Sequence, residues 1–174
     1  MAAPYSFRTV WRVDALPDRV WRALTAAVTG RSASWWRAMR VVSPARRIDR
    51  GEQMRAEVHA PLGYRLRLVL TLTRVRPGHA ISAESSGDLE GRGSVEVRRE
   101  GAGSEVRFAW DVEVRRRWMR LLDPVLRPVF AVAHRMVMRA GERGLREALH
   151  GAPRSARRKP ANPVPRGGGR RHAE

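Results

Sequence analysis

The sequence predicts an α+β fold in which a curved antiparallel sheet of seven strands surrounds a long C-terminal helix, with two short helices after the first strand. Two observations carry this prediction. From Arg40 to Arg116, apolar and polar residues alternate with a period of two in six short runs. From Trp118 to Leu149, the spacing becomes helical and stays so over a length that suits one long amphipathic helix.

The N-terminal region predicts one strand followed by one helix. In Tyr5–Val13 every second residue is aromatic or β-branched, which indicates a strand with one buried face. The next segment, Asp14–Ala27, has apolar residues at helical spacing, and Pro17 suits the first turn of a helix. Gly30 is expected to end this helix.

Two adjacent tryptophans, Trp35 and Trp36, follow in a second short helix that is expected to start at Ser32 or Ser34. Neighbouring residues on a helix point in different directions. We therefore expect only one of the two rings to face the core, and the other to lie at the rim of a cavity or under a loop.

Six further strands are separated by short turns rich in proline and glycine. Connections this short favour an antiparallel meander, because parallel neighbours need crossovers of about a dozen residues or more. The expected strands are Val41–Arg50, Gln53–Ala60, Tyr64–Arg76, Ala80–Ser86, Gly93–Arg99 and Ser104–Arg116.

The alternation also predicts which side chains face inward. Burying an unpaired arginine or glutamate would cost several kcal/mol, so the charged rows are expected on the convex, solvated side of the sheet. The inner face is then almost purely apolar. It contains the rows Met54–Ala56–Val58, Leu66–Leu68–Leu70–Leu72 and Val106–Phe108–Trp110–Val112–Val114.

On the last helix, Asp123 is expected to cap the start and Pro124 to take the first helical position. Small residues at the centre of the inward stripe leave two alternatives: either the backbones pack very closely there, or a cavity remains. At about 100° per residue, the inward stripe is Leu122, Leu126, Val129, Phe130, Ala133, Met136, Val137, Ala140 and Gly144.

Several short motifs resemble one known superfamily over roughly Tyr5 to Leu149. They are Leu16-Pro17-Asp18-Arg19-Val20-Trp21, the pair Trp35-Trp36, the segment Gly87-Asp88-Leu89-Glu90-Gly91, and His134 followed by Val137-Met138 and Gly144-Leu145. The chain resembles the SRPBCC or START-like superfamily, specifically the polyketide cyclase/dehydrase-like proteins. The resemblance implies the helix-grip (START/Bet v 1-like) fold, with an apolar ligand cavity between the curved sheet and the last helix.

The candidate site residues follow from the inward rows and the resemblance. Two titratable side chains, His134 and Tyr64, are candidates for chemistry, although no catalytic role is assigned to either. The five histidines have no metal-ligand spacing and no nucleotide-binding motif is present, so neither a metal nor a cofactor is expected. The expected ligand-binding residues are Trp36, Met54, Val58, Tyr64, Leu66, Leu68, Leu70, Ile81, Phe108, Trp110, Phe130, Ala133, His134 and Val137.

The formal charge of +18 is large, but its source is unusual. Of the 35 basic residues only Lys159 is a lysine, a pattern that resembles GC-rich codon usage more than a selected binding surface. No recognition motif accompanies the charge, so we expect no specific nucleic-acid binding. We draw the domain boundary near His150, with residues 1–150 as one ligand-binding domain.

Residues 151–174 are rich in proline, glycine and arginine and are expected to form a disordered basic tail. This tail could attract an anionic membrane or RNA weakly. The alternative is a solvated tail without a partner.

Localisation is inferred from what the sequence lacks. The chain has no cysteine, which excludes disulfides, thiolate zinc sites and cysteine nucleophiles. Its N-terminal residues show neither the basic start nor the apolar stretch of a signal peptide. The longest apolar region, Val125–Met138, falls short of the roughly 20 residues that a bilayer span needs. These features favour a cytoplasmic protein.

Two classes of function remain, and a third is weaker. The favoured function is non-catalytic binding of a hydrophobic small molecule, such as a lipid, a polyketide or another ring compound. The alternative is a metal-free cyclase or dehydratase that uses the same cavity, with His134 or Tyr64 moving a proton. The third is contact with anionic partners through the basic exterior.

Overall fold

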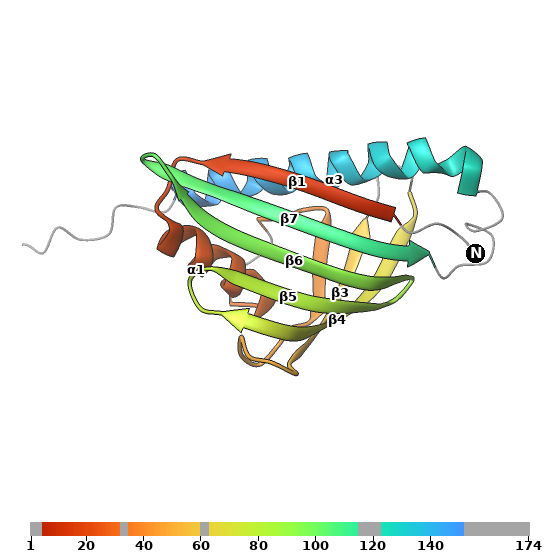
Figure 1. The fold of residues 1–174 in the computed structure, drawn as a ribbon, viewed down its shortest axis with the longest axis horizontal. Coiled ribbons are helices and arrows are strands. Elements are labelled where there is room, and N and C mark those ends of the chain that lie inside the picture. Colours follow the sequence, from red (N-terminus) through yellow and green to blue (C-terminus); the bar gives the residue numbers. More distant parts are fainter. Residues whose placement is uncertain (1–4, 32–34, 60–62, 115–122, 152–174) are drawn as a thin grey trace, which may run out of the picture.

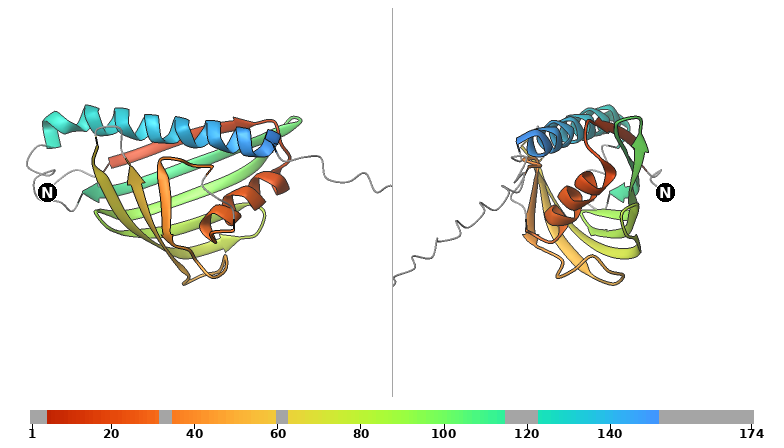
Figure 2. Two further views of the ribbon diagram at one scale, coloured as in Figure 1. Left: turned by 180° about the vertical axis from the view of Figure 1, so that it is seen from behind. Right: turned by 90° about the vertical axis from the view of Figure 1, so that its left-hand side faces the viewer.

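The computed structural model describes residues 5–31, 35–59, 63–114 and 123–151. The seven strands form one curved antiparallel sheet, and a long helix runs across the concave side of this sheet (Figures 1 and 2). This architecture confirms the predicted fold class.

The strands follow one another in space as a meander, with the order β1-β7-β6-β5-β4-β3-β2, so β1 and β2 are the two edges. β1 returns to pair with β7 and thereby brings the N-terminal strand beside the last one. The bounds are β1 Tyr5–Val13, β2 Met39–Ser43, β3 Gln53–His59, β4 Arg65–Arg76, β5 Ala80–Gly87, β6 Leu89–Glu100 and β7 Gly103–Val114.

Two expected strands differ from the structure by more than two residues at one end. The expected strand Val41–Arg50 is shorter, because β2 ends at Ser43 and the chain then turns back through bends to β3. The expected strand Gly93–Arg99 is longer: Gly91 and Gly93 pair with Val112 and Trp110 of β7 inside β6. A glycine inside a strand is tolerated here because a neighbour occupies the space of the missing side chain.

The helices flank the sheet at two places. α1 (Pro17–Val28) has its proline in the first turn. It covers one end of the inner face of the sheet, where it contacts β6 and β7. α3 (Asp123–Gly151) crosses the open side of the sheet and contacts β1 and α1. Residues 32–34 lie outside the described part of the chain, so the expected start of the second short helix does too. Trp35–Ala38 form bends and a turn.

The core lies at the α1 end of the molecule. Trp11, Val20, Val106 and Leu145 are essentially inaccessible to solvent and bring together β1, α1, β7 and the second half of α3. The other half of the space between the sheet and α3 is not filled in this way. The fold therefore has a packed end and an open end, and the site lies in the open one.

The convex face carries charged residues, as predicted from the alternation. Arg8 of β1 makes a two-pronged ion pair with Asp111 of β7, and Ser6 donates a hydrogen bond to the same carboxylate at 2.6 Å. These bonds hold the pKa of the Asp111 carboxyl below its usual value. Glu105 is an exception to full solvation, because Arg12 and Arg107 cover its side chain.

Candidate ligand cavity

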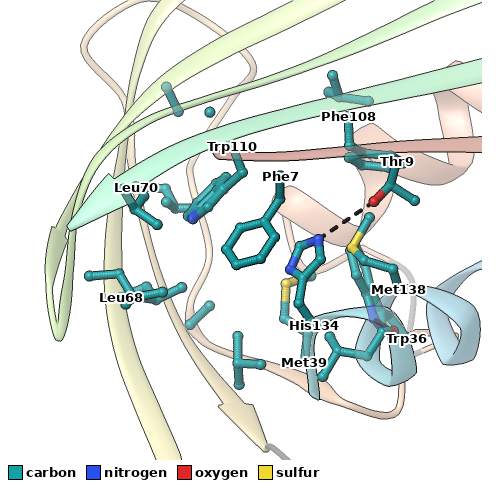
Figure 3. A pocket seen from close by; sticks show the side chains of 18 of the residues that line it. Phe7, Thr9, Trp36, Met39, Leu68, Leu70, Phe108, Trp110, His134 and Met138 are labelled. Atoms are coloured by element: carbon teal, nitrogen blue, oxygen red, sulfur yellow. Dashed lines mark hydrogen bonds between the residues drawn. The ribbon is translucent and has the colours of Figure 1, made fainter. Parts of the chain in front are cut away.

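A cavity of about 280 Å³ lies between the inner face of the sheet and the first half of α3. Strands β1 and β3–β7 supply most of its wall, α3 supplies Phe130, Ala133, His134, Val137 and Met138, and α1 contributes its C-terminal half. Figure 3 shows side chains from the sheet and from α3 turned toward this space. The two layers predicted from the sequence thus enclose the cavity between them.

All fourteen residues expected to bind a ligand line this cavity. They comprise two residues of β3, three leucines of β4, Tyr64 just before β4, two aromatic residues of β7, Ile81 of β5, the bend residue Trp36 and four residues of α3. Their placement on one surface follows from the alternation, because residues two apart in a strand share a face. Contact with a ligand stays a prediction.

Eighteen lining residues are not among those expected, and three of them, Tyr5, Phe7 and Thr9, belong to β1. Phe7 and Thr9 share the inward phase of β1, so the alternation of this strand carried the signal. Their place beside the cavity depends on the β1–β7 pairing, in which Phe7 lies opposite Trp110 and Thr9 opposite Phe108. Because this pairing joins segments distant in the chain, local sequence patterns did not indicate it.

Both tryptophans of the pair line the cavity and pack against the same core cluster, which corrects the expectation that only one would face the core. Because Trp35 and Trp36 sit in a bend, their rings need not diverge as they would on a helix, and they stack at 5.7 Å. Trp36 Nε1 donates to the carbonyl oxygen of Val137 at 3.0 Å, and Trp35 Nε1 donates to that of Ala23. These bonds hold the pair against α3 and α1.

The lining is almost entirely apolar. Among the described residues that form it, none is an aspartate, glutamate, lysine or arginine. The polar side chains are Tyr5, Thr9, Tyr64, Ser94 and His134. A ligand in this cavity would therefore meet hydrocarbon and aromatic surface nearly everywhere, with few hydrogen-bonding groups to fix its orientation.

His134 is a polar residue set among aromatic neighbours. Its ring stacks on Phe7 with centroids 4.1 Å apart and an angle of 17° between the planes. Its Nε2 lies 3.5 Å from Oγ1 of Thr9, a long hydrogen bond (Figure 3). Burial lowers the pKa of the imidazole to about 4. The ring is therefore uncharged at neutral pH.

Tyr64 lies just before the start of β4 and belongs to a group of three rings. Its ring meets Phe130 edge-on at 6.1 Å, and Phe130 in turn meets Tyr5 edge-on at 5.8 Å. Burial raises the pKa of the Tyr64 phenol, so the hydroxyl stays protonated and can donate a hydrogen bond. The three rings come from β1, α3 and the residue that leads into β4, and they form one border of the site.

The small residues of α3 divide between the two alternatives left open by the sequence. A Cβ on Gly144 would lie only 1.8 Å from the carbonyl oxygen of Trp35, and one on Gly141 would lie 2.6 Å from the ring of Trp36. Backbones therefore pack very closely in the second half of the helix. Ala133, in the first half, lines the cavity instead. Close packing and a cavity thus occur on the same helix, about two to three turns apart.

The inward stripe of α3 is rotated relative to the expected one. Met136 was expected to face inward but is exposed, as is Val132 one turn before it, whereas Met138 and Leu145 are buried. The stripe follows Phe130, His134, Val137 and Gly141 instead. Gly141 packs against the ring of Trp36 but, as a glycine, adds nothing to an apolar periodicity, so the sequence pattern did not indicate the rotation. Leu122 lies outside the described residues, as does the side chain of Leu126.

This geometry defines a helix-grip protein with an apolar cavity, and the comparisons agree with it. The family described as "Polyketide cyclase / dehydrase and lipid transport" matches residues 5–150. The chain belongs to this family, within the SRPBCC superfamily that the motifs resemble. No curated protein sequence matches the chain.

Solved structures share the fold at low sequence identity. The Zhui aromatase/cyclase from Streptomyces sp. R1128 is similar with a TM-score of 0.67 and 14% identity, over 87% of this chain and 97% of that one. TTHA0849 from Thermus thermophilus gives 0.64 and 17%, over 86% and 99%. Ara h 8.0201 gives 0.56 and 8%, over 86% and 99%.

Within the described residues, no helix is long and apolar enough to cross a membrane. α3, the longest of them, alternates buried apolar positions with exposed arginines such as Arg135 and Arg139. Its first half lines the cavity and its second half packs in the core.

Proposed function

We propose that this protein binds a hydrophobic small molecule, such as a lipid, a polyketide or another ring compound, in the cavity between the sheet and α3. The observation that carries the proposal is the apolar lining of a 280 Å³ cavity in a family that includes lipid transport. Apolar surface left open in a folded protein is costly unless something covers it, and each Å² of it buried by a ligand is worth about 25 cal/mol.

The size of the cavity limits the ligand. A volume of 280 Å³ lies near the lower end of the range for small-molecule sites, roughly 300–1,000 Å³. A compound of two or three rings, or a chain of similar volume, fits this space better than a large multi-ring product. The aromatic side chains of Trp36, Phe108 and Trp110 favour flat ring systems.

A cyclase or dehydratase activity in the same cavity is the second candidate, because His134 is a neutral imidazole that faces the ligand space. The pKa values argue against efficient proton transfer, however. An imidazole with a pKa of about 4 is a weak base at neutral pH, and the raised pKa of Tyr64 makes it a weaker acid. Both groups suit hydrogen bonding to a ligand better than proton transfer.

Native mass spectrometry of protein purified from its own host tests the binding proposal. We expect a co-purified apolar molecule that leaves when the protein is denatured. A protein that arrives empty, and that also binds no member of a panel of fatty alcohols and aromatic polyketides, would contradict it. For the enzyme candidate, His134→Ala and Tyr64→Phe would have to lower turnover of a bound polyketide far more than its affinity.

A further inference from the structure

We propose that the cavity selects uncharged ligands that carry a hydrogen-bonding group, such as a ring hydroxyl or carbonyl, and that this group binds between Thr9 and His134. The inference rests on the proposed function and deepens it by naming the chemistry of the ligand. It predicts that carboxylates, including fatty-acid anions, are rejected by the same site.

The first argument is the charge of the lining. No described lining residue carries a lysine or arginine side chain, so a ligand carboxylate would enter the cavity without a counter-ion. The arginines of β1 project on the convex side, where Arg8 is held by Asp111. Burying an unpaired carboxylate in apolar surroundings is strongly unfavourable.

His134 does not replace the missing cation. With a pKa of about 4, its imidazole is protonated in only about one molecule in a thousand at pH 7. Phe7 covers one face of the ring, and the described lining holds no acidic side chain that would favour its charged form. The site can therefore offer hydrogen bonds but not a stable positive charge.

The second argument is the geometry of the polar pair. The 3.5 Å between Nε2 of His134 and Oγ1 of Thr9 exceeds the usual hydrogen-bond length of about 2.7–3.2 Å. Within the described structure, His134 makes no other side-chain hydrogen bond. A ligand hydroxyl can donate to a ring nitrogen and accept from the threonine, and a ligand carbonyl can accept from either group.

The third argument is that the pair is held in place from both sides of the cavity. Thr9 belongs to β1, which pairs with β7 along its whole length, and His134 belongs to α3 (Figure 3). The stack on Phe7, two residues before Thr9 on the same strand, fixes the plane of the imidazole. A polar group held so rigidly inside an apolar cavity is suited to orient one end of a ligand.

The test compares three probes of the same ring system by calorimetric titration at pH 7: naphthalene, uncharged 2-naphthol and the anion 2-naphthoate. We expect 2-naphthol to bind roughly tenfold more tightly than naphthalene, the gain of one added hydrogen bond. We expect 2-naphthoate to bind at least about 100-fold more weakly than 2-naphthol, because of its unpaired charge.

Two variants locate the preference. Thr9→Val keeps the shape of a β-branched strand residue and removes the hydroxyl, and His134→Phe keeps a flat ring and removes the nitrogens. Each should bring 2-naphthol close to naphthalene while changing naphthalene affinity less than about threefold. If His134→Phe fails to fold, Thr9→Val and the three-probe series on the unaltered protein still test whether the site prefers an uncharged hydrogen-bonding ligand.

The outcomes separate this inference from the proposed function. If none of the three probes binds and other apolar compounds also fail, the proposed function falls. If naphthalene binds but 2-naphthol gains nothing, or if 2-naphthoate binds as well as 2-naphthol, the ligand-binding function stands and the selection for uncharged polar-tipped ligands is overturned. Retention of the full 2-naphthol preference in both variants would also overturn it.

Discussion

At the scale of single residues, His134 shows how its surroundings change what a side chain can do. The sequence places a histidine near the edge of an apolar helical stripe. In the structure the ring stacks on Phe7 and lies 3.5 Å from the hydroxyl of Thr9, and burial lowers its pKa to about 4. The residue type alone suggested proton transfer, whereas its environment favours a neutral hydrogen-bonding group.

The lowered pKa of His134 predicts a pH dependence of stability. The unfolded chain takes up a proton near pH 6.5, but the folded site resists it until about pH 4. The free energy of unfolding should therefore fall as the pH falls from 6.5 to 4. This one group should contribute a loss of about 2 kcal/mol, less than a fully buried ring would.

Denaturant unfolding of the unaltered protein and of His134→Phe at pH 7 and pH 4.5 measures this contribution. Groups other than His134 titrate in both proteins. The difference between the two proteins in how far the free energy of unfolding changes from pH 7 to pH 4.5 therefore isolates the contribution of the histidine. The variant should lose less stability between the two pH values. Equal slopes would mean that the imidazole titrates as it does in the unfolded chain.

The residues that line the cavity were predictable to different degrees for a physical reason. Alternation in a strand places Leu66, Leu68 and Leu70 on one face whatever their partners, so a local pattern suffices. Thr9 matters only because β1 pairs with β7, about 100 residues away along the chain. A pairing of that range leaves no periodic signal in either strand.

At the scale of elements, α3 combines two kinds of contact. Its second half packs on the tryptophan pair through Gly141 and Gly144, and its first half borders the cavity through Ala133 and Val137. The sequence identified Ala133 and Gly144 as small inward residues, but not Gly141, and it could not assign them to either contact. Gly144 is the point where this packing is tightest.

A single methyl group at Gly144 tests that packing. In an exposed helix interior, Gly→Ala stabilises by up to about 1 kcal/mol. Here the new Cβ would lie 1.8 Å from the Trp35 carbonyl oxygen, so Gly144→Ala should destabilise the protein by about 2 kcal/mol or more in denaturant unfolding.

Gly151→Ala is the matched control for this substitution. Gly151 belongs to the same helix, and nothing lies within 4 Å of the position that its Cβ would take. Its stability should change by no more than about 0.5 kcal/mol. Equal effects of the two substitutions would mean that α3 does not seat on the tryptophan pair.

At the scale of the whole molecule, the fold class was readable because many local signals agree. Short turns require antiparallel neighbours, charged rows require a convex face, and a long amphipathic helix requires a surface to cover. The rotation of α3 by about one residue was not readable, because it depends on close packing against Trp35 and Trp36, about 100 residues away along the chain.

The net charge of the molecule leads to a separate prediction about residues 152–174, which lie outside the described residues. This segment carries seven of the 35 basic residues. If it attracts anionic surfaces, its deletion should weaken binding to phosphatidylserine vesicles or RNA at physiological salt, by about 1 kcal/mol per charge that contacts the surface. Co-sedimentation of both chains with vesicles measures this effect, and unchanged binding would indicate a tail without such a partner.

The central claim is that an apolar ligand occupies the space beneath the first half of α3, and two neighbouring residues test it directly. Ala133 lines the cavity and is buried, whereas Val132 is 48% exposed on the outer face of the same helix turn. A phenylalanine at position 133 would fill ligand space, while one at 132 would point into solvent.

The decisive measurement is the affinity of Ala133→Phe and Val132→Phe for naphthalene, read by tryptophan fluorescence, since Trp36 and Trp110 line the cavity. We expect Ala133→Phe to weaken binding at least about 100-fold, because the ligand loses most of its apolar contact. Val132→Phe should bind as the unaltered protein does. Undiminished binding by folded Ala133→Phe would place the ligand elsewhere and contradict the account.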